Sequence, residues 1–241
     1  MNDAIVQIDG LDKSYGNHVA LQNLELEIEK GEVFGLLGPN GSGKTTLFQT
    51  MMGQLTPTSG DIQVLGQDAY KDTFDVSKGV GFLPADIRFY DNLTARKNLE
   101  YLAELVDEDP DIEELLELVN LQEEANKKVS GFSHGMQKRL GIAQTLIKEP
   151  DLILFDEPTT GLDPERKEDF KDLIQRINKE KDITVIVASH ILHEIENLCD
   201  RIGVLKDGKI QVTGTPEDIM DEADAETLEE AYLEITRGDF R

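Results

Sequence analysis

The spacing of apolar residues along this chain predicts both strands and helices. Leu24, Leu26 and Ile28 alternate with glutamates, which is typical of a half-exposed strand. An earlier strand-like segment opens with the apolar residues Ile5, Val6, Ile8 and Leu11. Continuous apolar runs, typical of buried strands, occupy residues 33–37, 80–83, 152–155, 183–188 and 202–205, and shorter strands are expected at 61–64 and 209–213. The N-terminal part therefore mixes an antiparallel sheet with the start of a buried strand core.

Between Thr94 and about Ile147 the apolar spacing changes to that of amphipathic helices. Thr94 is an expected N-cap, and the last helix of this region is expected to end before Pro150. Its inner face is formed by the apolar residues Met136, Leu140, Ala143 and Ile147. The region is therefore predicted to be an inserted helical subdomain. Near the end of the chain, residues 215–218 form a capping box with proline at the first helical position, followed by a short acidic helix.

A glycine-rich segment directly follows the buried run 33–37. It is Gly38-Pro39-Asn40-Gly41-Ser42-Gly43-Lys44-Thr45-Thr46, and apolar residues at helical spacing come after it. Strand, glycine loop and helix form the context of a phosphate-binding loop, the P-loop. Its glycines let backbone N–H groups converge on phosphate oxygens, Lys44 adds a charge for the β- and γ-phosphates, and the Thr45 hydroxyl can bind Mg²⁺. The alternative is a glycine-rich turn that matches the pattern by chance.

Two carboxylates, Asp156 and Glu157, follow the apolar run 152–155. At the C-terminal end of a parallel strand they lie where such folds bind ligands. Asp156 can hold Mg²⁺ directly or through water, and Glu157 can orient or deprotonate the water that attacks a γ-phosphate. An acidic pair alone is more often a solvated strand end, but its combination with the P-loop favours the functional interpretation.

His190 and Ser133 are further candidate site residues. His190 follows the run 183–188, and an imidazole at such a strand end can hydrogen-bond a γ-phosphate. A zinc site built from His190 and His193 lacks further ligands at sensible spacing. Ser133 is expected to cap the helix that follows, and Gly135 permits close approach to the N-terminus of that helix. This N-terminus is either a plain cap or an anion site.

Composition narrows the class of protein and its partners. The 241 residues suffice for one α/β domain with a subdomain. With 49 acidic and 24 basic side chains, the formal net charge is −25, so nucleic acid is not expected as a partner. Such an acidic excess also suggests a cytoplasm of high salt, which screens self-repulsion. The single Cys199 excludes an intramolecular disulfide. Neither a membrane helix nor a signal segment at Met1–Asp3 is expected, which predicts a soluble, cytosolic protein.

Taken in order, these motifs resemble the nucleotide-binding domain of ABC transporters over essentially the whole chain. Phe132-Ser133-His134-Gly135-Met136 stands where that family has its LSGGQ signature, and Thr160-Gly161-Leu162-Asp163 matches the D-loop. Tyr15, in the expected loop 13–16, matches the aromatic residue that stacks on adenine, and His190 matches the switch histidine. The implied fold is α/β, a P-loop NTPase (RecA-like) core with an N-terminal antiparallel β subdomain and an inserted α-helical subdomain.

The resemblance implies a single ABC-type ATPase domain over residues 1–241. About residues 1–85 and 150–215 would form the nucleotide core with the β subdomain, about 86–149 the helical subdomain, and about 216–241 a short helical tail. The implied ligands are ATP and Mg²⁺. The implied nucleotide contacts are the nine P-loop residues together with Tyr15, Ser133, Gly135 and Asp163. The implied catalytic residues are Lys44, Glu157 and His190, and the implied metal ligands are Thr45 and Asp156.

The resemblance also implies a mechanism. Two such domains are expected to meet head to tail, so that each ATP lies between one P-loop and residues 133–135 of the second subunit. Loss of the γ-phosphate then removes the charge that both halves bind, which converts hydrolysis into motion. The chain is expected at the cytoplasmic face of the cell membrane, where it drives a separate membrane-spanning permease. Its signature, short helical subdomain and ending at 228–235 look like ATPases of the ABC-2 export class.

Two departures from the family pattern bear on this reading. A glutamine usually follows the proline at the position of Pro84 and bridges the Mg²⁺ site to the helical subdomain, but here Ala85 follows. The side chain of Asp86 is expected to point elsewhere, which predicts altered signalling through this loop. His134 and Met136 also replace the first glycine and the glutamine of the signature. Two alternative functions remain: a soluble member of the same family acting as an assembly factor or ATP-driven switch, and a sensor that binds ATP but barely hydrolyses it.

Overall fold

The computed structural model describes residues 4–237, and this part of the chain forms two β-sheets. The larger sheet has the strand order β10-β9-β3-β8-β7-β6, in which β10 is antiparallel to β9 and the other neighbours are parallel. Its strands are β3 (Val33–Leu37), β6 (Val80–Leu83), β7 (Leu152–Asp156), β8 (Thr184–Ser189), β9 (Arg201–Lys206) and β10 (Lys209–Gly214). Met1–Asp3, where no signal segment was expected, and residues 238–241 of the predicted tail lie outside the described residues.

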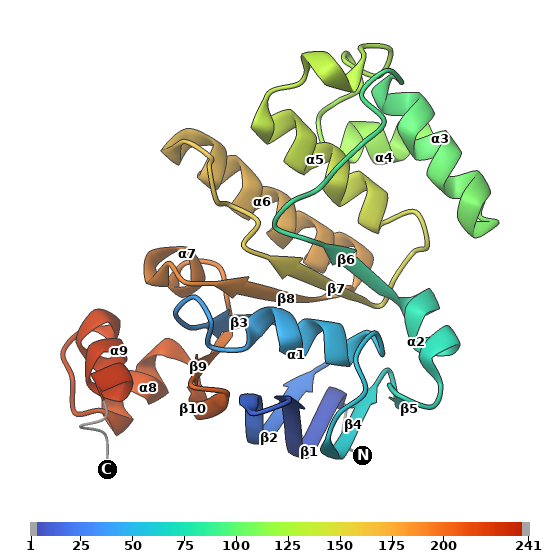
Figure 1. Ribbon diagram of the computed structural model, residues 1–241. Helices are drawn as coiled ribbons and strands as arrows, with labels where there is room; N and C mark the ends of the chain where they lie inside the picture. Colours follow the sequence, from blue (N-terminus) through green and yellow to red (C-terminus); the bar gives the residue numbers. More distant parts are fainter. Residues whose placement is uncertain (1–3, 238–241) are drawn as a thin grey trace.

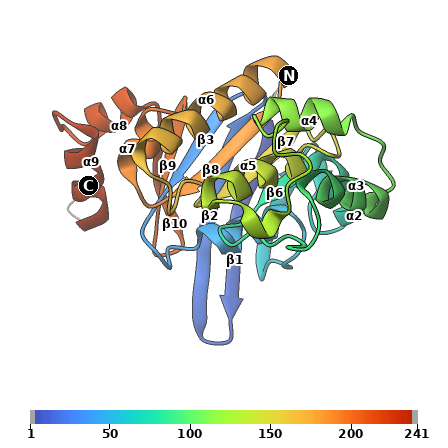
Figure 2. The same ribbon diagram turned by 90° about the horizontal axis from the view of Figure 1, so that it is seen from above.

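The smaller sheet is antiparallel and has the strand order β2-β1-β4-β5. Its strands are β1 (Ala4–Tyr15), β2 (His18–Glu29), β4 (Ser59–Val64) and β5 (Gln67–Asp68). Figure 2 shows that the ends of β1 and β2 extend beyond the rest of the molecule as a hairpin. This sheet confirms the antiparallel N-terminal part that the alternating pattern predicts.

Helix α1 (Lys44–Met51) lies between the two sheets (Figure 1). Leu47 and Phe48 are fully buried in the apolar core that fills this layer, together with Leu154 of the larger sheet. The neighbouring residues Ile153 and Phe155 belong to a second core on the opposite face of that sheet. Since both faces of the larger sheet are buried, its strands appear in the sequence as continuous apolar runs.

Helices cover the second face of the larger sheet (Figure 1). Helix α6 (Pro164–Lys181) packs on β8, and α3 (Ala95–Val106), α4 (Ile112–Leu118), the 3₁₀ helix η1 (Val129–Gly131) and α5 (His134–Thr145) form a group beside it. The remaining helices are α2 (Thr73–Gly79) before β6, α7 (Leu192–Glu196) after β8, and α8 (Pro216–Glu222) and α9 (Leu228–Arg237) beside β10. Within residues 4–237, no helix has both the length and the apolar character needed to cross a bilayer.

Several helices begin at the caps that the sequence predicts. The Thr94 hydroxyl accepts a hydrogen bond from the backbone N–H of Lys97 at 3.2 Å, at the start of α3. Thr215 and Asp218 form a reciprocal capping box at the start of α8, with Pro216 at the first helical position. These caps satisfy N–H groups that the helix itself leaves unpaired, so the helix starts are set locally by the sequence.

The structure corrects the loop expected at residues 13–16. Strand β1 continues to Tyr15, which pairs with His18 across a turn made of Gly16 and Asn17. Gly16 has a φ of +60°, which suits the tight turns that join hairpin strands. The turn is therefore shorter than expected, and Tyr15 is held by strand pairing.

The prediction also missed helix α6 and the exact number of tail helices. The sequence signals for α6 are Asp163 as N-cap, proline at the first helical position, and the buried residues Phe170, Leu173, Ile174 and Ile177 at helical spacing. The tail contains two short helices, α8 and α9, where one was expected. Helix α5 ends at Thr145, before Pro150, as the sequence predicts.

Candidate functional site

Four chain segments meet at one edge of the larger sheet because the strands that lead to them are parallel. Strand β3 leads into the P-loop, β7 ends at Asp156, β8 leads into His190, and β6 leads into Pro84 and Ala85. The carboxyl ends of parallel strands are the place where open α/β sheets bind ligands. The structure thus brings the P-loop, the acidic pair and His190 together.

The P-loop forms a cradle that fits phosphate. Gly43, with a φ of +113°, precedes α1, and no side chain caps the first turn of this helix. The Ser42 hydroxyl is buried and has no hydrogen-bond partner in the described part of the chain. Backbone hydrogen bonds from Gly38 N to Ser189 O (3.1 Å) and from Gly208 N to Ser42 O (3.0 Å) fix the loop. A buried unpaired hydroxyl beside uncapped amides suits a ligand rich in oxygen atoms.

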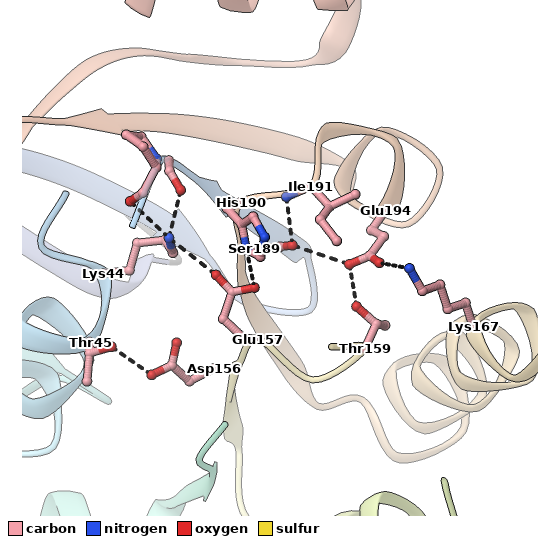
Figure 3. A network of polar contacts seen from close by, with 12 residues as sticks. Lys44, Thr45, Asp156, Glu157, Thr159, Lys167, Ser189, His190, Ile191 and Glu194 are labelled. Atoms are coloured by element: carbon pink, nitrogen blue, oxygen red, sulfur yellow. Dashed lines mark hydrogen bonds and ion pairs between the residues drawn. The ribbon is translucent and has the colours of Figure 1, made fainter. Parts of the chain in front are cut away.

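The Lys44 ammonium lies at the centre of the site (Figure 3). It donates hydrogen bonds to the carbonyl oxygens of Gly38 (2.7 Å) and Pro39 (3.3 Å), and it forms an ion pair with Glu157 Oε1 at 3.3 Å. The other carboxylate oxygen of Glu157, Oε2, lies 2.8 Å from His190 Nδ1. Lys44, Glu157 and His190 therefore form one continuous chain of polar contacts.

An unusual backbone conformation separates the two consecutive carboxylates. Glu157 has a φ of +49°, in the left-handed region that residues other than glycine seldom adopt, and its N–H donates to Ala188 O at 2.9 Å. The conformation costs about 1–2 kcal/mol. It directs Glu157 toward Lys44 and His190, while Asp156 points to Thr45 (Figure 3). One short segment can therefore serve two chemical roles.

Thr45 and Asp156 offer two oxygen atoms side by side. The Thr45 hydroxyl donates to Asp156 Oδ2 at 2.8 Å. Burial raises the pKa of Asp156 above its usual range and Glu157 adds to this shift, while the Thr45 hydrogen bond and the cations Lys44 and Lys138 oppose it. Residues 4–237 contain no cluster of three or more His, Cys, Asp or Glu side chains arranged for a metal. Mg²⁺ fits this pair, because it is usually held by one or two protein oxygens together with substrate phosphates and water.

A second carboxylate, Glu194 of α7, joins three segments next to His190 (Figure 3). Its Oε2 accepts hydrogen bonds from the hydroxyls of Thr159 and Ser189, and its Oε1 lies 2.8 Å from the ammonium of Lys167 on α6. The Glu194 side chain is 12% exposed. Sequence reasoning missed this cluster, because Thr159 and Glu194 are 35 residues apart and no local pattern links them.

The N-terminus of α5 forms a separate candidate anion site, the signature side of the molecule. The Ser133 hydroxyl accepts a hydrogen bond from Met136 N at 3.4 Å. A Cβ on Gly135 would lie 3.1 Å from Cδ of Arg166, so glycine allows α6 to pack closely here. A cavity of about 210 Å³ lies between these two helices. Within residues 4–237, no hydrogen bond or ion pair joins Ser133 or Gly135 to the P-loop.

His134 links the signature side to the D-loop. It is exposed, as expected of a surface residue, and its Nε2 lies 3.1 Å from the carbonyl oxygen of Thr160. The nearby Gly161 has a φ of +82°, and a Cβ there would lie 3.2 Å from the His134 ring. The histidine at this signature position therefore makes a contact that a glycine could not make.

Tyr15 and Asp163 lie outside the contacts around Lys44. Tyr15 is 46% exposed near the tip of the β1–β2 hairpin, with the Lys13 ammonium 5.1 Å from its ring centre. Asp163 caps α6 by accepting a hydrogen bond from Arg166 N at 3.0 Å. An exposed aromatic ring suits stacking on a base, but the nucleotide contacts of Tyr15 and Asp163 stay predictions.

Ala85, at the position where the family has a glutamine, is exposed, and its side chain offers no polar atom. Its carbonyl oxygen accepts a hydrogen bond of 2.6 Å from the ammonium of Lys138 on α5. Asp86 is exposed as well. Sequence reasoning did not single out Lys138, because a lysine in an amphipathic helix is normally a surface residue.

A phosphate cradle with its lysine, a hydroxyl–carboxylate pair and a second carboxylate at one sheet edge define a P-loop nucleoside triphosphatase. A family model described as "ABC transporter" matches residues 21–160. The bacitracin transport ATP-binding protein BcrA of Bacillus licheniformis is 40% identical over 208 residues, which cover 86% of this chain and 68% of that protein. The linearmycin resistance ATP-binding protein LnrL of Bacillus subtilis strain 168 is 34% identical over 229 residues, 93% of this chain and 73% of that protein.

Solved structures give the same result. CbiO1 from Clostridium perfringens, part of the ABC transporter complex CbiONQ, has a TM-score of 0.83 and 28% identity over 91% of this chain and 92% of that one. The dimeric, post-hydrolysis structure of the ATP-binding cassette MJ0796 bound to ADP and Pi has a TM-score of 0.77 and 28% identity. The match covers 87% of this chain and 98% of that chain. The chain belongs to the ABC transporter family. It is an ATP-binding subunit that binds ATP with Mg²⁺ and hydrolyses ATP.

Proposed function

We propose that this chain powers an ABC exporter by pairing head to tail with a second ATP-binding subunit on a separate membrane-spanning permease. The observation that carries the proposal is the separation of two phosphate-binding features on one chain. The P-loop residues Lys44 and Thr45 contact Glu157 and Asp156, and Glu157 contacts His190. Within residues 4–237, no hydrogen bond or ion pair joins the Ser133–Gly135 segment to these groups. A second subunit is the natural source of the missing half of each site.

The relatives support the transport role and its direction. BcrA is named for bacitracin transport and LnrL for linearmycin resistance, and CbiO1 is described as part of a transporter complex. For this chain we propose export within the ABC-2 export class and a permease partner, supported by these names for transport, resistance and a transporter complex. The proposed location is the cytoplasmic face of the cell membrane. The helical region at about 86–149 is the part proposed to face the permease, between the core regions at about 1–85 and 150–215, with the tail at about 216–241.

In this proposal the residues of the P-loop side bind and orient the triphosphate. The P-loop amides and the Ser42 hydroxyl hold phosphate oxygens, and Lys44 neutralises charge on the β- and γ-phosphates. Thr45 and Asp156 would hold Mg²⁺, which would supply further neutralisation of phosphate charge. Tyr15 stacks on the adenine.

Glu157 and His190 are proposed to act on the attacking water. The oxygen of the attacking water bonds to the γ-phosphorus, and Glu157 accepts a proton from that water. The bond between the γ-phosphorus and the leaving oxygen of ADP breaks. The Nδ1 atom of His190, 2.8 Å from Glu157 Oε2, holds the carboxylate in place. In the imidazolium form both ring nitrogens carry a proton, so Nε2 can also donate to the γ-phosphate. Ser133 and Gly135 of the second subunit bind the other side of the same phosphate, and Asp163 lies at the D-loop contact between subunits.

The Glu157→Gln variant tests the catalytic part of this proposal. An amide has nearly the same shape as the carboxylate but cannot take the proton, so turnover is expected to fall by about 10²–10³-fold. ATP binding should persist, and an ATP-bound dimer should accumulate in size-exclusion chromatography with ATP and Mg²⁺. The matched control is Glu165→Gln on the exposed face of α6, which should keep normal turnover.

Two outcomes would contradict the proposal. Normal turnover of Glu157→Gln would remove Glu157 from the catalytic role, and a monomer at saturating ATP would contradict the paired site. The permease is tested separately by purifying the tagged chain from solubilised membranes. A polytopic membrane protein in fixed ratio supports transport, whereas a chain without such a partner favours the soluble member of the family.

A further inference from the structure

One buried cation near the site has no role in the mechanism above. Lys138 of α5 is only 1% exposed, and among the described residues its ammonium donates a hydrogen bond to the Ala85 carbonyl at 2.6 Å. Burying an ammonium is costly unless the surroundings compensate its charge. One carbonyl oxygen compensates it only in part, so other charges nearby must stabilise Lys138.

Those charges are carboxylates near the carboxyl ends of the parallel strands, where the P-loop lies. Burial lowers the pKa of Lys138, while Asp86, Asp156 and Glu157 raise it. Strand β6 pairs with β7 so that Leu83 lies opposite Phe155, and the Ala85 carbonyl that binds Lys138 therefore lies at the same sheet edge as Asp156 and Glu157. In the described part of the chain no carboxylate forms an ion pair with Lys138, so these groups act on it through space. Lys138 therefore lies within the electric field of the proposed metal carboxylate.

Lys138 also lies at a tightly packed junction. A Cβ on Gly141 of α5 would lie 2.5 Å from Cδ1 of Leu83 and 2.6 Å from Cδ1 of Ile87. A Cβ on Gly81 of β6 would lie 2.8 Å from the Thr145 carbonyl oxygen. Because the two glycines bring the helix and the strand into direct contact, a displacement of the loop after β6 must also displace α5. Ser133 is the N-cap of the same helix and lies about 7–8 Å along its axis from Lys138.

We propose that Lys138 is a positioning residue that couples the metal carboxylate Asp156 to the signature helix α5 through the Ala85 carbonyl. The Lys138 side chain on α5 thus links the Mg²⁺ site to the helical subdomain, a role that the apolar side chain of Ala85 cannot perform. This inference rests on the proposed metal role of Asp156 and the proposed phosphate contact of Ser133. A divalent cation bound by Asp156 changes the charge that faces Lys138, so metal binding and the position of α5 influence each other.

The test compares Lys138→Met with a matched lysine. Lys148 also donates to a backbone carbonyl, that of Ser77 at 3.0 Å. Ser77 belongs to α2, which precedes β6, so Lys148 lies at the opposite end of the sheet from Asp156. Each full-length variant is titrated with Mg²⁺ in the presence of a fluorescent ATP analogue, and the melting temperature and turnover are measured in parallel. Asp156→Asn serves as the positive control for loss of metal binding.

Removal of the Lys138 ammonium should strengthen Mg²⁺ binding, and it should weaken the coupling between Asp156 and helix α5. For Lys138→Met we expect the half-saturating Mg²⁺ concentration to fall about three- to tenfold and kcat to fall about tenfold. Lys148→Met should change both by less than about twofold. Simple loss of structure would weaken metal binding and turnover together, so tighter metal binding with slower turnover distinguishes a positioning role.

A second pair of variants addresses position 85 directly. A glutamine at position 85 would be able to bridge Asp156 and helix α5. The double variant Ala85→Gln/Lys138→Met should then have a kcat at least about threefold higher than that of Lys138→Met. An unchanged Mg²⁺ half-saturation in Lys138→Met overturns the inference, and where that variant does not fold, Lys138→Gln decides by the same measurement. Absence of recovery in the double variant overturns the shared role of the two positions. The titration needs neither a dimer nor a permease, so it can fail independently of the proposed function.

Discussion

The P-loop side and the signature side of this molecule suit the same kind of ligand, yet the chain completes them to different degrees. On the P-loop side, Lys44 contacts Glu157, Glu157 contacts His190, and Thr45 contacts Asp156. On the signature side, Ser133 makes one long cap hydrogen bond beside a cavity of about 210 Å³.

This difference separates binding from turnover. A set of charges that is arranged within one chain can hold a nucleotide without help, because its geometry is fixed before the ligand arrives. A helix N-terminus beside a cavity provides N–H groups but little else, and it acts only when a phosphate is brought to it. We therefore expect loss of the cradle cation Lys44 to lower ATP affinity, and changes on the signature side to affect turnover alone.

The largest expected effect is on ATP turnover. A change on either side alone should nearly abolish turnover, and mixing the two variants should restore part of it. Lys44→Met removes the cation of the cradle, and Gly135→Asp places a carboxylate where the second subunit needs an anion site. Each alone should lower turnover by about 10²–10³-fold. A mixed pair contains one intact composite site, so an equal mixture should recover about a quarter of normal activity.

Binding measurements on the separate variants sharpen the same comparison. ATP affinity should fall for Lys44→Met and stay within about twofold of normal for Gly135→Asp. The nearest atom to a Cβ at position 135 belongs to the flexible side chain of Arg166, so the substitution fits sterically. No recovery on mixing, with both variants folded, would mean that each site is complete within one chain.

A smaller effect is expected from Glu194, which contacts Thr159 directly before the D-loop, Ser189 at the end of β8, and Lys167 on α6. Glu194→Gln keeps the shape but weakens the contacts with Lys167, Thr159 and Ser189, so kcat should fall by about five- to twentyfold at unchanged ATP affinity. Glu196→Gln on the same helix is the control, because Glu196 is exposed and, among residues 4–237, its only ion pair is a 3.9 Å contact with His193. Equal kinetics of the two variants would show that Glu194 does not position the site.

The smallest effect should come from His134, whose contact with the Thr160 carbonyl joins α5 to the D-loop. His134→Ala removes one partly exposed hydrogen bond, worth about 0.5–1.5 kcal/mol. We expect turnover to fall by about two- to fivefold while ATP affinity is unchanged, as measured by steady-state kinetics and equilibrium binding. A larger fall in affinity than in kcat would assign His134 to the P-loop side instead.

The sequence was most informative where the signal is local. The P-loop, the two carboxylates after β7 and the histidine after β8 each follow an apolar strand, so parallel pairing alone brings them to one edge. Caps such as Thr94 and Ser133 could be predicted because each acts on an N–H group three residues away. These features depend on the chain direction and on short-range geometry.

Other features depend on which segments become neighbours. Glu194 meets Thr159 only because β7 and β8 are adjacent, and Lys138 meets Ala85 only because α5 packs on β6. The sequence predicts a loop at Tyr15, because the local pattern around Gly16 and Asn17 does not show that they form a tight hairpin turn. Nothing in the local pattern around Lys138 distinguishes it from a surface lysine, so its burial had to be observed.

The left-handed backbone of Glu157 has a consequence for how this chain can evolve. Glycine or asparagine is favoured at a φ of +49°, so a glutamate is retained there against the preference of the backbone. Selection for heat resistance or expression alone would tend to replace it, because relieving such strain is an accessible stabilising change. The resulting variant would be more stable and would still form a dimer, but it would not hydrolyse ATP. It would therefore act as a dominant inhibitor of its partner subunit.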